Sequence, residues 1–151
     1  MDSNKKKDGT GYRPVVGLAL LSLLLCGLLF PLLITGLGQL LFPYQANGEL
    51  VQFNGRVAGS YLIAQTFSQP IFFHPRNDSA SGVDPDISVQ DAFGQVARIS
   101  AATGISVASL DSLINQNTDG VSSALGIPYV NVLALNLALI SAHPSVYGSY
   151  G

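Results

Sequence analysis

One stretch of the chain, Pro14–Gly48, carries no charged side chain over 35 residues. Its most apolar part, the 23 residues Val15–Leu37, consists mainly of Leu and Val. As an α-helix rising about 1.5 Å per residue, this part would reach roughly 35 Å, whereas the hydrocarbon core of a bilayer is about 30 Å thick. Membrane helices tolerate a proline such as Pro31, which we expect to kink the segment. We therefore predict a transmembrane helix over residues 14–42.

The charges before this helix predict its orientation. Lys5–Lys7 and Arg13 precede it, and basic residues next to a membrane span stay on the cytoplasmic side. We expect residues 1–13 to be a basic cytoplasmic tail and residues 43–151 to be an extracytoplasmic domain, so that the chain crosses the cell membrane once. A cleaved signal peptide is the main alternative, but its apolar region would span only about 7–15 residues. Only Ala46 resembles a cleavage residue here.

Composition excludes several classes of partner and fold. Charged residues make up 11% of the chain, against about 25% in an ordinary soluble protein. All the lysines lie in the tail. From Glu49 onward there are three arginines and seven acidic residues, which gives this part a net charge of −4. Because a nucleic-acid-binding protein concentrates basic residues on its folded domain, we expect no nucleic-acid partner. The lone Cys26 lies in the predicted helix, so the outer part must fold without an intramolecular disulfide.

Strand and turn patterns predict how the outer part begins. Residues 49–58 read as a tight β-hairpin around Asn54-Gly55, because these two residues supply the positive φ angles of a type I′ turn. Tyr61–Phe67 and Ile71–Phe73 are candidates for two more strands. His74–Asp86 is rich in Pro, Gly, Asn and Asp, which predicts a loop.

Helical periodicity follows this loop. Ser88 with Asp91 three residues later resembles a capping box, and Gly104 is a typical helix stop. The inward face predicted for this helix is Val89, Ala92, Phe93, Val96, Ala97 and Ser100. A second helix is predicted from Ser106, and residues 115–123 then read as a polar loop. The inward residues of the second helix are Leu110, Leu113 and Ile114.

The last apolar segment, residues 127–140, permits two interpretations. Asn131 can cap a buried helix whose inward residues are Leu133, Leu137 and Ile140, while alternation from Asn131 onward also permits a strand. The segment is too short and too polar for a second membrane span. The whole pattern predicts a membrane-anchored α+β protein, with one N-terminal transmembrane helix followed by a small mixed α/β extracytoplasmic domain.

Familiar catalytic patterns are missing from the sequence. No lysine follows Lys7, and there is no phosphate-binding Gly-rich loop with Lys, no HExxH, no cysteine pair and no G-x-S-x-G motif. His74 and His143 are isolated and read as structural or solvated residues. Asp84 and Asp86 could attract a cation, but a turn beside a helix start explains them better. We expect no catalytic residue, no bound cofactor and no metal site in this chain.

Four blocks of residues, in order, carry a family resemblance. They are Leu37-Gly-Gln with Phe42-Pro and Gln45-Ala-Asn-Gly; Gly59-Ser-x-Leu-Ile-Ala-Gln with Phe72-Phe-His; Ser79-Ala-Ser-Gly-Val-Asp-Pro-Asp-Ile-Ser; and Gln95-Val-x-Arg-Ile with residues 125–139. Together they resemble the C subunit (KdpC) family of the Kdp-type potassium-transporting P-type ATPase. The resemblance marks as candidate interaction residues Gln39, Phe42, Pro43, Gln45, Asn47, Gly48, Gly59, Ser60, Gln65, Ser81, Gly82, Asp84, Pro85, Arg98, Pro128, Asn131 and Asn136.

One departure from the family accompanies this resemblance. Typical members carry a longer insert, rich in Gly, Ser and Asn, where only Pro75–Asp78 connects the second and third blocks here. Asn77-Asp78-Ser79 also matches the N-glycosylation pattern, which is short enough to recur by chance.

The resemblance implies a place in a four-part complex. Its partners would be a potassium-pore subunit (A), an ATP-hydrolysing subunit (B) and a small F peptide, so ATP and K⁺ would act at the level of the complex. For the C subunit the family implies a need in assembly and stability of the complex, together with either guarding the outer pore entrance or raising the ATP affinity of the B subunit. A self-standing, membrane-anchored binding or sensory module is the alternative from residues alone.

Overall fold

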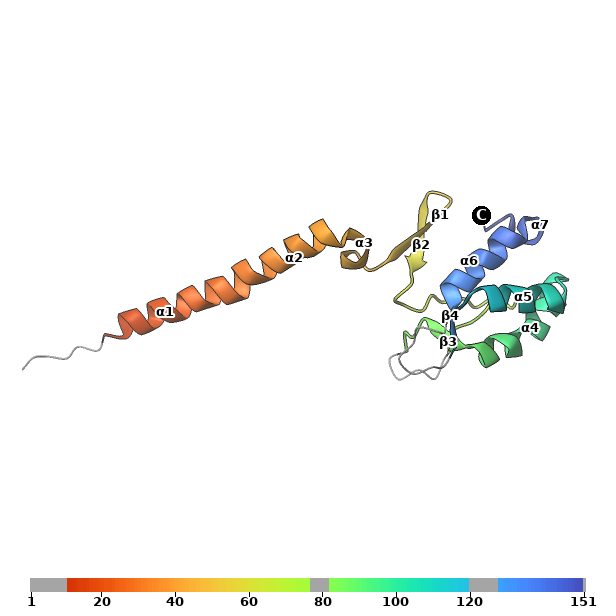
Figure 1. Cartoon of the computed structure of the whole chain (residues 1–151), viewed down its shortest axis with the longest axis horizontal. Coiled ribbons are helices and arrows are strands. Elements are labelled where there is room, and N and C mark those ends of the chain that lie inside the picture. Colours follow the sequence, from red (N-terminus) through yellow and green to blue (C-terminus); the bar gives the residue numbers. More distant parts are fainter. Residues whose placement is uncertain (1–10, 77–81, 120–127, 151) are drawn as a thin grey trace, which may run out of the picture. The chain divides into compact units, whose positions relative to one another are not determined.

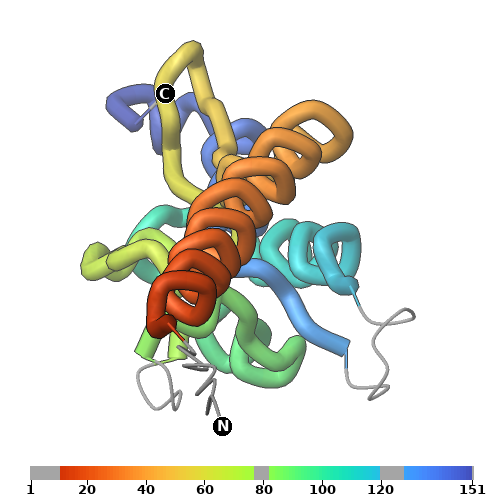
Figure 2. The backbone as a smooth tube through the Cα atoms, turned by 90° about the vertical axis from the view of Figure 1, so that its left-hand side faces the viewer, coloured from red at the N-terminus to blue at the C-terminus, as the bar shows by residue number. Residues whose placement is uncertain are grey.

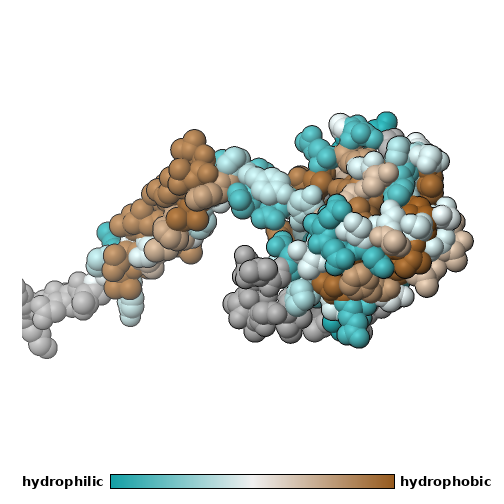
Figure 3. Space-filling view, turned by 45° about the vertical axis from the view of Figure 1, so that its right-hand side comes forward, coloured by the Kyte–Doolittle hydropathy of each residue, from teal (hydrophilic) through white to brown (hydrophobic). Residues whose placement is uncertain are grey.

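The computed structural model describes residues 11–76, 82–119 and 128–150 (Figure 1). Helix α1 (Tyr12–Leu24), the π-helical turn η1 (Leu25–Leu29) and helix α2 (Phe30–Leu41) form one continuous helix of 30 residues with a mean hydropathy of 2.6. None of its residues is buried, and apolar side chains cover most of the surface seen in Figure 3. Length and composition are those of a helix that could cross a membrane.

The helix departs from regular α-helical hydrogen bonding just before Pro31, while the predicted kink stays a prediction. A proline has no N–H for an α-helical hydrogen bond, and its ring clashes with the carbonyl group four residues earlier. The helix widens into the π turn directly before Pro31, where the N–H of Phe30 donates to the carbonyl of Leu25, five residues back. The Thr35 hydroxyl donates to the Pro31 carbonyl at 2.8 Å. The hydroxyl of Thr35 is thus satisfied within the helix itself.

The chain divides into two compact units between Ala46 and Asn47. The first unit ends with the short helix α3 (Pro43–Ala46), and the second opens with two residues of positive φ, Gly48 and Glu49.

The predicted hairpin is confirmed. Strands β1 (Leu50–Phe53) and β2 (Arg56–Ser60) pair antiparallel, with a register shift after Val51. Asn54 and Gly55 have φ values of 49° and 75°, which are the left-handed angles that a type I′ turn requires.

Residues 61–76, here called the linking segment, contain neither a strand nor a helix, so both strands predicted there are wrong. Phe72 and Phe73 are nevertheless buried in the core, and Phe67 and Ile71 pack against it. Aromatic content predicted strands because it favours burial on a pleated sheet. Here burial occurs without a neighbouring strand, because side chains from the helices satisfy the backbone instead.

Three short strands form the second sheet, in the order β3-β5-β4 with both pairs antiparallel. They are β3 (Asp86–Ser88), β4 (Thr118–Asp119) and β5 (Tyr129–Asn131). β3 lies at the end of the predicted loop and β4 in the predicted polar loop, so both were missed. Strands this short carry too little alternation to be recognised.

Helix α4 (Val89–Thr103) begins and ends as predicted. The Ser88 hydroxyl accepts from the Asp91 N–H and donates to its carboxylate, at 3.0 and 2.7 Å, and Gly104 closes the helix at a φ of 76°. The buried stripe is narrower than expected and comprises Ala92, Val96 and Ile99. Phe93 and Ala97 are exposed, which corrects the predicted face.

Helix α5 (Val107–Gln116) is confirmed with its cap at Ser106 and its inward residues Leu110, Leu113 and Ile114. For residues 127–140, the helix interpretation is confirmed: the side-chain oxygen of Asn131 caps helix α6 (Val132–Ala142) by accepting from the Ala134 N–H at 3.1 Å. The strand predicted from Asn131 onward is wrong, because β5 ends at Asn131 where the helix begins. Leu133 is buried as predicted, whereas Leu137 and Ile140 are only partly buried.

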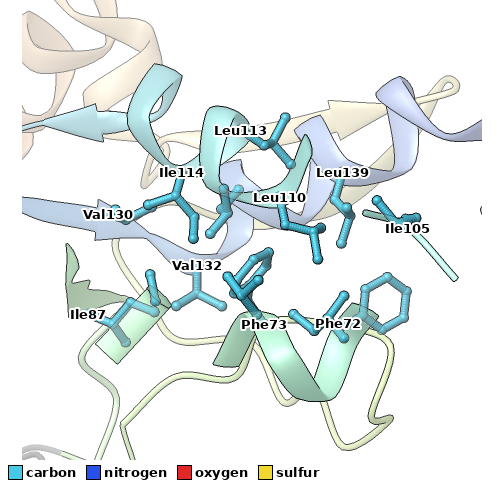
Figure 4. Packing of buried hydrophobic residues seen from close by; sticks show 14 of the residues in the cluster. Phe72, Phe73, Ile87, Ile105, Leu110, Leu113, Ile114, Val130, Val132 and Leu139 are labelled. Atoms are coloured by element: carbon cyan, nitrogen blue, oxygen red, sulfur yellow. The ribbon is translucent and has the colours of Figure 1, made fainter. Parts of the chain in front are cut away.

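The core lies between α4, α5, α6 and the linking segment (Figure 4). Phe73, Ile99, Leu110, Leu135 and Leu139 are fully enclosed within it. A last short helix, α7 (Pro144–Tyr147), adds the buried Tyr147. In Figures 1 and 2 the C-terminal end lies beside the β1–β2 hairpin.

Candidate functional site

The candidate residues fall into several local groups rather than one pocket. Gln39, Phe42, Pro43 and Gln45 are exposed residues at the end of α2 and in α3, all in the first unit. The other candidates belong to the second unit. Ser81 lies outside the residues that the structure describes, as does the possible glycosylation acceptor Asn77.

A first group closes the base of the hairpin. The Ser60 hydroxyl donates to the Gly48 carbonyl at 2.6 Å and accepts from the Leu62 N–H at 3.1 Å. The amide of Gln65 lies against Gly59, where a Cβ atom would come within 2.8 Å of the Gln65 Cδ. A side chain at position 59 would displace Gln65, which explains the glycine. Asn47 begins the turn that leads into this group.

A second group joins the linking segment to the sheet. The amide of Asn131 donates to the Tyr61 carbonyl at 3.0 Å and to the Asp86 carboxylate at 2.9 Å. Burial raises the pKa of Asp86, the hydrogen bond from Asn131 opposes this rise, and the nearby Asp84 and Asp119 carboxylates add to it.

The Asp84-Pro85-Asp86 turn supports the same junction. Asp84 accepts from the Asp86 N–H at 3.1 Å, and the Pro85 carbonyl accepts from the Val132 N–H at 3.0 Å. Gly82 precedes this turn at a φ of 67°, and Pro128 is exposed just before β5. The turn interpretation of this block is therefore supported by its hydrogen bonds.

A third group holds the other end of the linking segment through α4. The Arg98 guanidinium donates to the carbonyls of Pro70 and Phe72 and to the side chain of Gln95. Gln95 in turn accepts from the His74 N–H at 2.8 Å and donates to the His74 carbonyl at 3.1 Å. Burial lowers the pKa of Arg98 from its usual value, although a guanidinium stays charged.

The last candidate, Asn136, is the one polar side chain among the described residues that is completely enclosed in the core. Its oxygen accepts from the Phe73 N–H at 2.8 Å, and its amide donates to the Phe73 carbonyl at 2.9 Å. This pair of bonds reproduces what a neighbouring strand would provide. A buried backbone amide left without such a partner would be costly.

Sequence reasoning missed three residues that act on the same segment. Gln95 binds His74 as described, and the hydroxyls of Tyr147 and Tyr150 donate to the Ile71 carbonyl and the Gln69 side chain at 2.7 and 2.6 Å. No periodicity marks the two tyrosines, because they follow the last long helix. Gln95 had a usable signal, since it falls within a family block together with Arg98.

Two hollows adjoin the linking segment. The first, here called the apolar cleft, has a volume of about 310 Å³ and is walled by the hairpin, the linking segment and α6. Its apolar side chains are Phe53, Phe67, Phe72, Leu133, Leu137, Ile140 and Tyr150. The second, of about 450 Å³, is more polar and includes Gln65, His74 and Arg76.

The chemistry available at these positions is limited. Residues 11–76, 82–119 and 128–150 contain no group of three or more His, Cys, Asp or Glu side chains placed to hold a metal ion. The Ser109 hydroxyl and His143 Nε2 lie 3.4 Å apart, a long distance for a nucleophile and its base. The hydrogen bonds described above join main-chain segments to one another. The main role of the second-unit candidates that make these bonds is therefore to stabilise the fold.

Comparison with known proteins shows the family. The family model of the c chain of the K⁺-transporting ATPase, KdpC, matches residues 12–78 and 77–141. The KdpC subunit 2 of the potassium-transporting ATPase of Staphylococcus aureus is 33% identical over 180 aligned positions, which cover 84% of this chain and 96% of the relative. The KdpC subunits of Gemmatimonas aurantiaca and Erwinia tasmaniensis are 35% and 36% identical, over 85% and 84% of this chain and 92% and 95% of theirs.

The same comparisons show that the relatives contain residues that this chain lacks. The Staphylococcus aureus alignment has 180 positions but uses only 84% of 151 residues, so about 50 positions have no counterpart here. The two family-model matches meet at residues 77–78, which agrees with the departure seen in the sequence. By both the family model and its relatives, the chain belongs to the KdpC family, the c chain of the K⁺-transporting ATPase.

Proposed function

We propose that this chain is a non-catalytic accessory subunit that anchors in the cell membrane by α1–α2 and guards the outer entrance of the potassium pore. The observation that carries the proposal is the match of the KdpC model to residues 12–141, apolar helix included. In this proposal, residues 1–13 are cytoplasmic and residues 43–151 extracytoplasmic. The four basic side chains before the helix support that orientation.

The partners proposed are the pore subunit (A), the ATP-hydrolysing subunit (B) and the small F peptide. ATP and K⁺ are then handled by the complex, and this chain binds no cofactor of its own. The hydrogen bonds of the second-unit candidates support this division of labour. Ser60, Arg98 and Asn136, for example, bond the backbone of the hairpin base and of the linking segment.

The proposed orientation favours the pore over the nucleotide site. ATP is hydrolysed on the cytoplasmic side, where only the short tail of this chain would lie, while the second unit would face the potassium source. Raising the ATP affinity of the B subunit would then require either that tail or the opposite topology. Guarding the entrance requires neither.

Orientation can be tested with single cysteines, because Cys26 is the only native one. In a Cys26→Ala background, Ser112→Cys and Ser141→Cys place thiols on exposed positions of α5 and α6. A membrane-impermeant maleimide added to sealed right-side-out vesicles should label both without permeabilisation. The matched control Ser3→Cys should react only after the vesicles are opened, and the reverse pattern would refute the proposed topology.

Association can be tested by isolating the full chain from detergent-solubilised membranes. The accessory role predicts that two larger, multi-spanning proteins come with it in fixed proportion. A chain that is recovered alone while its partners remain in the same extract would instead favour the self-standing binding or sensory module.

A further inference from the structure

The last ten residues lie outside the region that the family model matches, which ends at residue 141. Those that the structure describes, residues 142–150, nevertheless fold back onto the core. Helix α6 ends at Ala142 and is capped by His143, where φ is −129°. The His143 carbonyl accepts from the N–H of Val146 and of Tyr147. The chain then turns once more, with the Tyr150 N–H donating to the Tyr147 carbonyl at 2.8 Å.

Tyr147 is held firmly by this fold. Its side chain is fully buried, and its ring centroid lies 5.4 Å from that of Phe72. Its hydroxyl donates to the Ile71 carbonyl at 2.7 Å. A buried ring with a satisfied hydroxyl is hard to release, because its departure would leave both a void and an unpaired carbonyl.

Tyr150 is held more weakly. Its side chain remains 43% exposed, and its ring lies edge-on to that of Phe72 with the two ring centroids 5.2 Å apart. Its hydroxyl donates to the exposed side chain of Gln69 at 2.6 Å. The same ring walls the apolar cleft and, with Ser149, a neighbouring hollow beside the hairpin. When Tyr150 leaves, water can replace its hydrogen bond, so its release costs far less than that of Tyr147.

We propose that residues 144–150 form a strap over the linking segment, in which Tyr147 is a fixed anchor and Tyr150 is a movable gate of the apolar cleft. The linking segment has particular need of such a strap. It contains no helix or strand, and the two family-model matches meet directly after it, at residues 77–78. Segments without regular hydrogen bonding open locally more readily than the elements around them.

Chymotrypsin digestion of the full chain tests the gate, because the enzyme cleaves after aromatic residues and reports local opening. The Phe72 ring contacts Tyr147 and Tyr150 of the strap, and the Phe67 ring contacts Phe72. The carbonyl of Tyr61 is instead held by Asn131. Tyr150→Ala should raise cleavage after Phe67 and Phe72 by roughly tenfold, because cleavage follows the population of the open form. Cleavage after Tyr61 should stay within about twofold of the unmodified chain.

Two variants separate the gate from general loss of structure. Ser149→Ala changes the exposed neighbour of Tyr150 and should leave every cleavage rate unchanged. Gln69→Ala removes only the partner of the Tyr150 hydroxyl and should give part of the Tyr150→Ala effect. Equal rates for Tyr150→Ala and Ser149→Ala would overturn the gate, as would a Tyr150→Ala chain cleaved equally faster at Tyr61, Phe67 and Phe72.

Discussion

Single polar side chains do much of the structural work in the second unit. Asn136, Asn131 and Arg98 each bond the backbone of the linking segment, where a strand would have bonded it in a larger sheet. The sequence marked all three as family residues, and it predicted the capping role of Asn131 correctly. It could not reveal the partners, because Asn136 and Phe73 are 63 positions apart in the chain.

The first prediction concerns Asn136. Asn136→Ala leaves the N–H and the carbonyl of Phe73 buried without partners, so the free energy of unfolding should fall by about 2–4 kcal/mol. Urea unfolding of the full chain in detergent, followed by the near-ultraviolet circular dichroism of tyrosine, measures this change. Ser141→Ala on the exposed side of the same helix is the control and should cost well under about 1 kcal/mol. Equal costs for the two variants would contradict the role given to Asn136.

The second prediction concerns Tyr147 at high pH. Burial, followed by the neighbouring Tyr150, raises the pKa of Tyr147 to about 12 in the folded chain, against 10.0 ordinarily. The folded state therefore holds this proton more tightly than the unfolded state, and the stability linked to it is present below about pH 10 and is lost between pH 10 and 12. An absorbance titration of tyrosinate should show one of the six tyrosines ionising last. Tyr147→Phe should abolish that late step, and its persistence would assign it to another residue.

Whole elements were predictable wherever local signals agree. The hairpin, α4 and α5 each have a turn or cap of the right chemistry beside a clear apolar pattern, and the structure contains all three. The linking segment failed because its aromatic residues are buried by long-range contacts that no local pattern encodes. The predicted buried face of α4 was displaced from the observed one for a similar reason, since packing buries Ile99 and leaves Phe93 exposed.

Two glycines of the α4 region give a matched prediction for this element. Gly94 lies within the helix on an exposed face with open space around it, so Gly94→Ala should stabilise the fold by roughly 0.5–1 kcal/mol. Gly104 closes the helix at a φ of 76°, so Gly104→Ala should destabilise it by about 1–2 kcal/mol. Urea unfolding of both variants measures the two effects. Changes of the same sign would contradict the helix end described here.

At the scale of the whole molecule, an apolar helix and a mixed helix-and-sheet unit were both foreseen. Hydropathy and charge change sharply near Gly48 and Glu49, and a 30-residue helix of mean hydropathy 2.6 needs no alignment to be recognised. Which side of the membrane holds the second unit remains a prediction, because it depends on the charges of the tail and not on packing within either unit.

The net charge of −4 from Glu49 onward leads to a prediction for the assembled transporter. If the second unit guards the pore, changing Asp84, Asp86 and Asp91 together to Asn should raise the potassium KM by no more than about twofold at physiological salt, where charges are screened beyond roughly 8 Å. The change should be larger at low ionic strength. Asp111→Asn on α5 is the control, and a KM that stays constant at low ionic strength would remove the electrostatic part of the proposal.

The position of Tyr150 has a practical consequence for anyone who expresses this protein. Only one residue would separate a purification tag fused after Gly151 from the Tyr150 ring, which contacts Phe72 and Gln69. Such a fusion would add bulk at the edge of the apolar cleft. Removing such a tag before biochemical work restores the chain end at this edge.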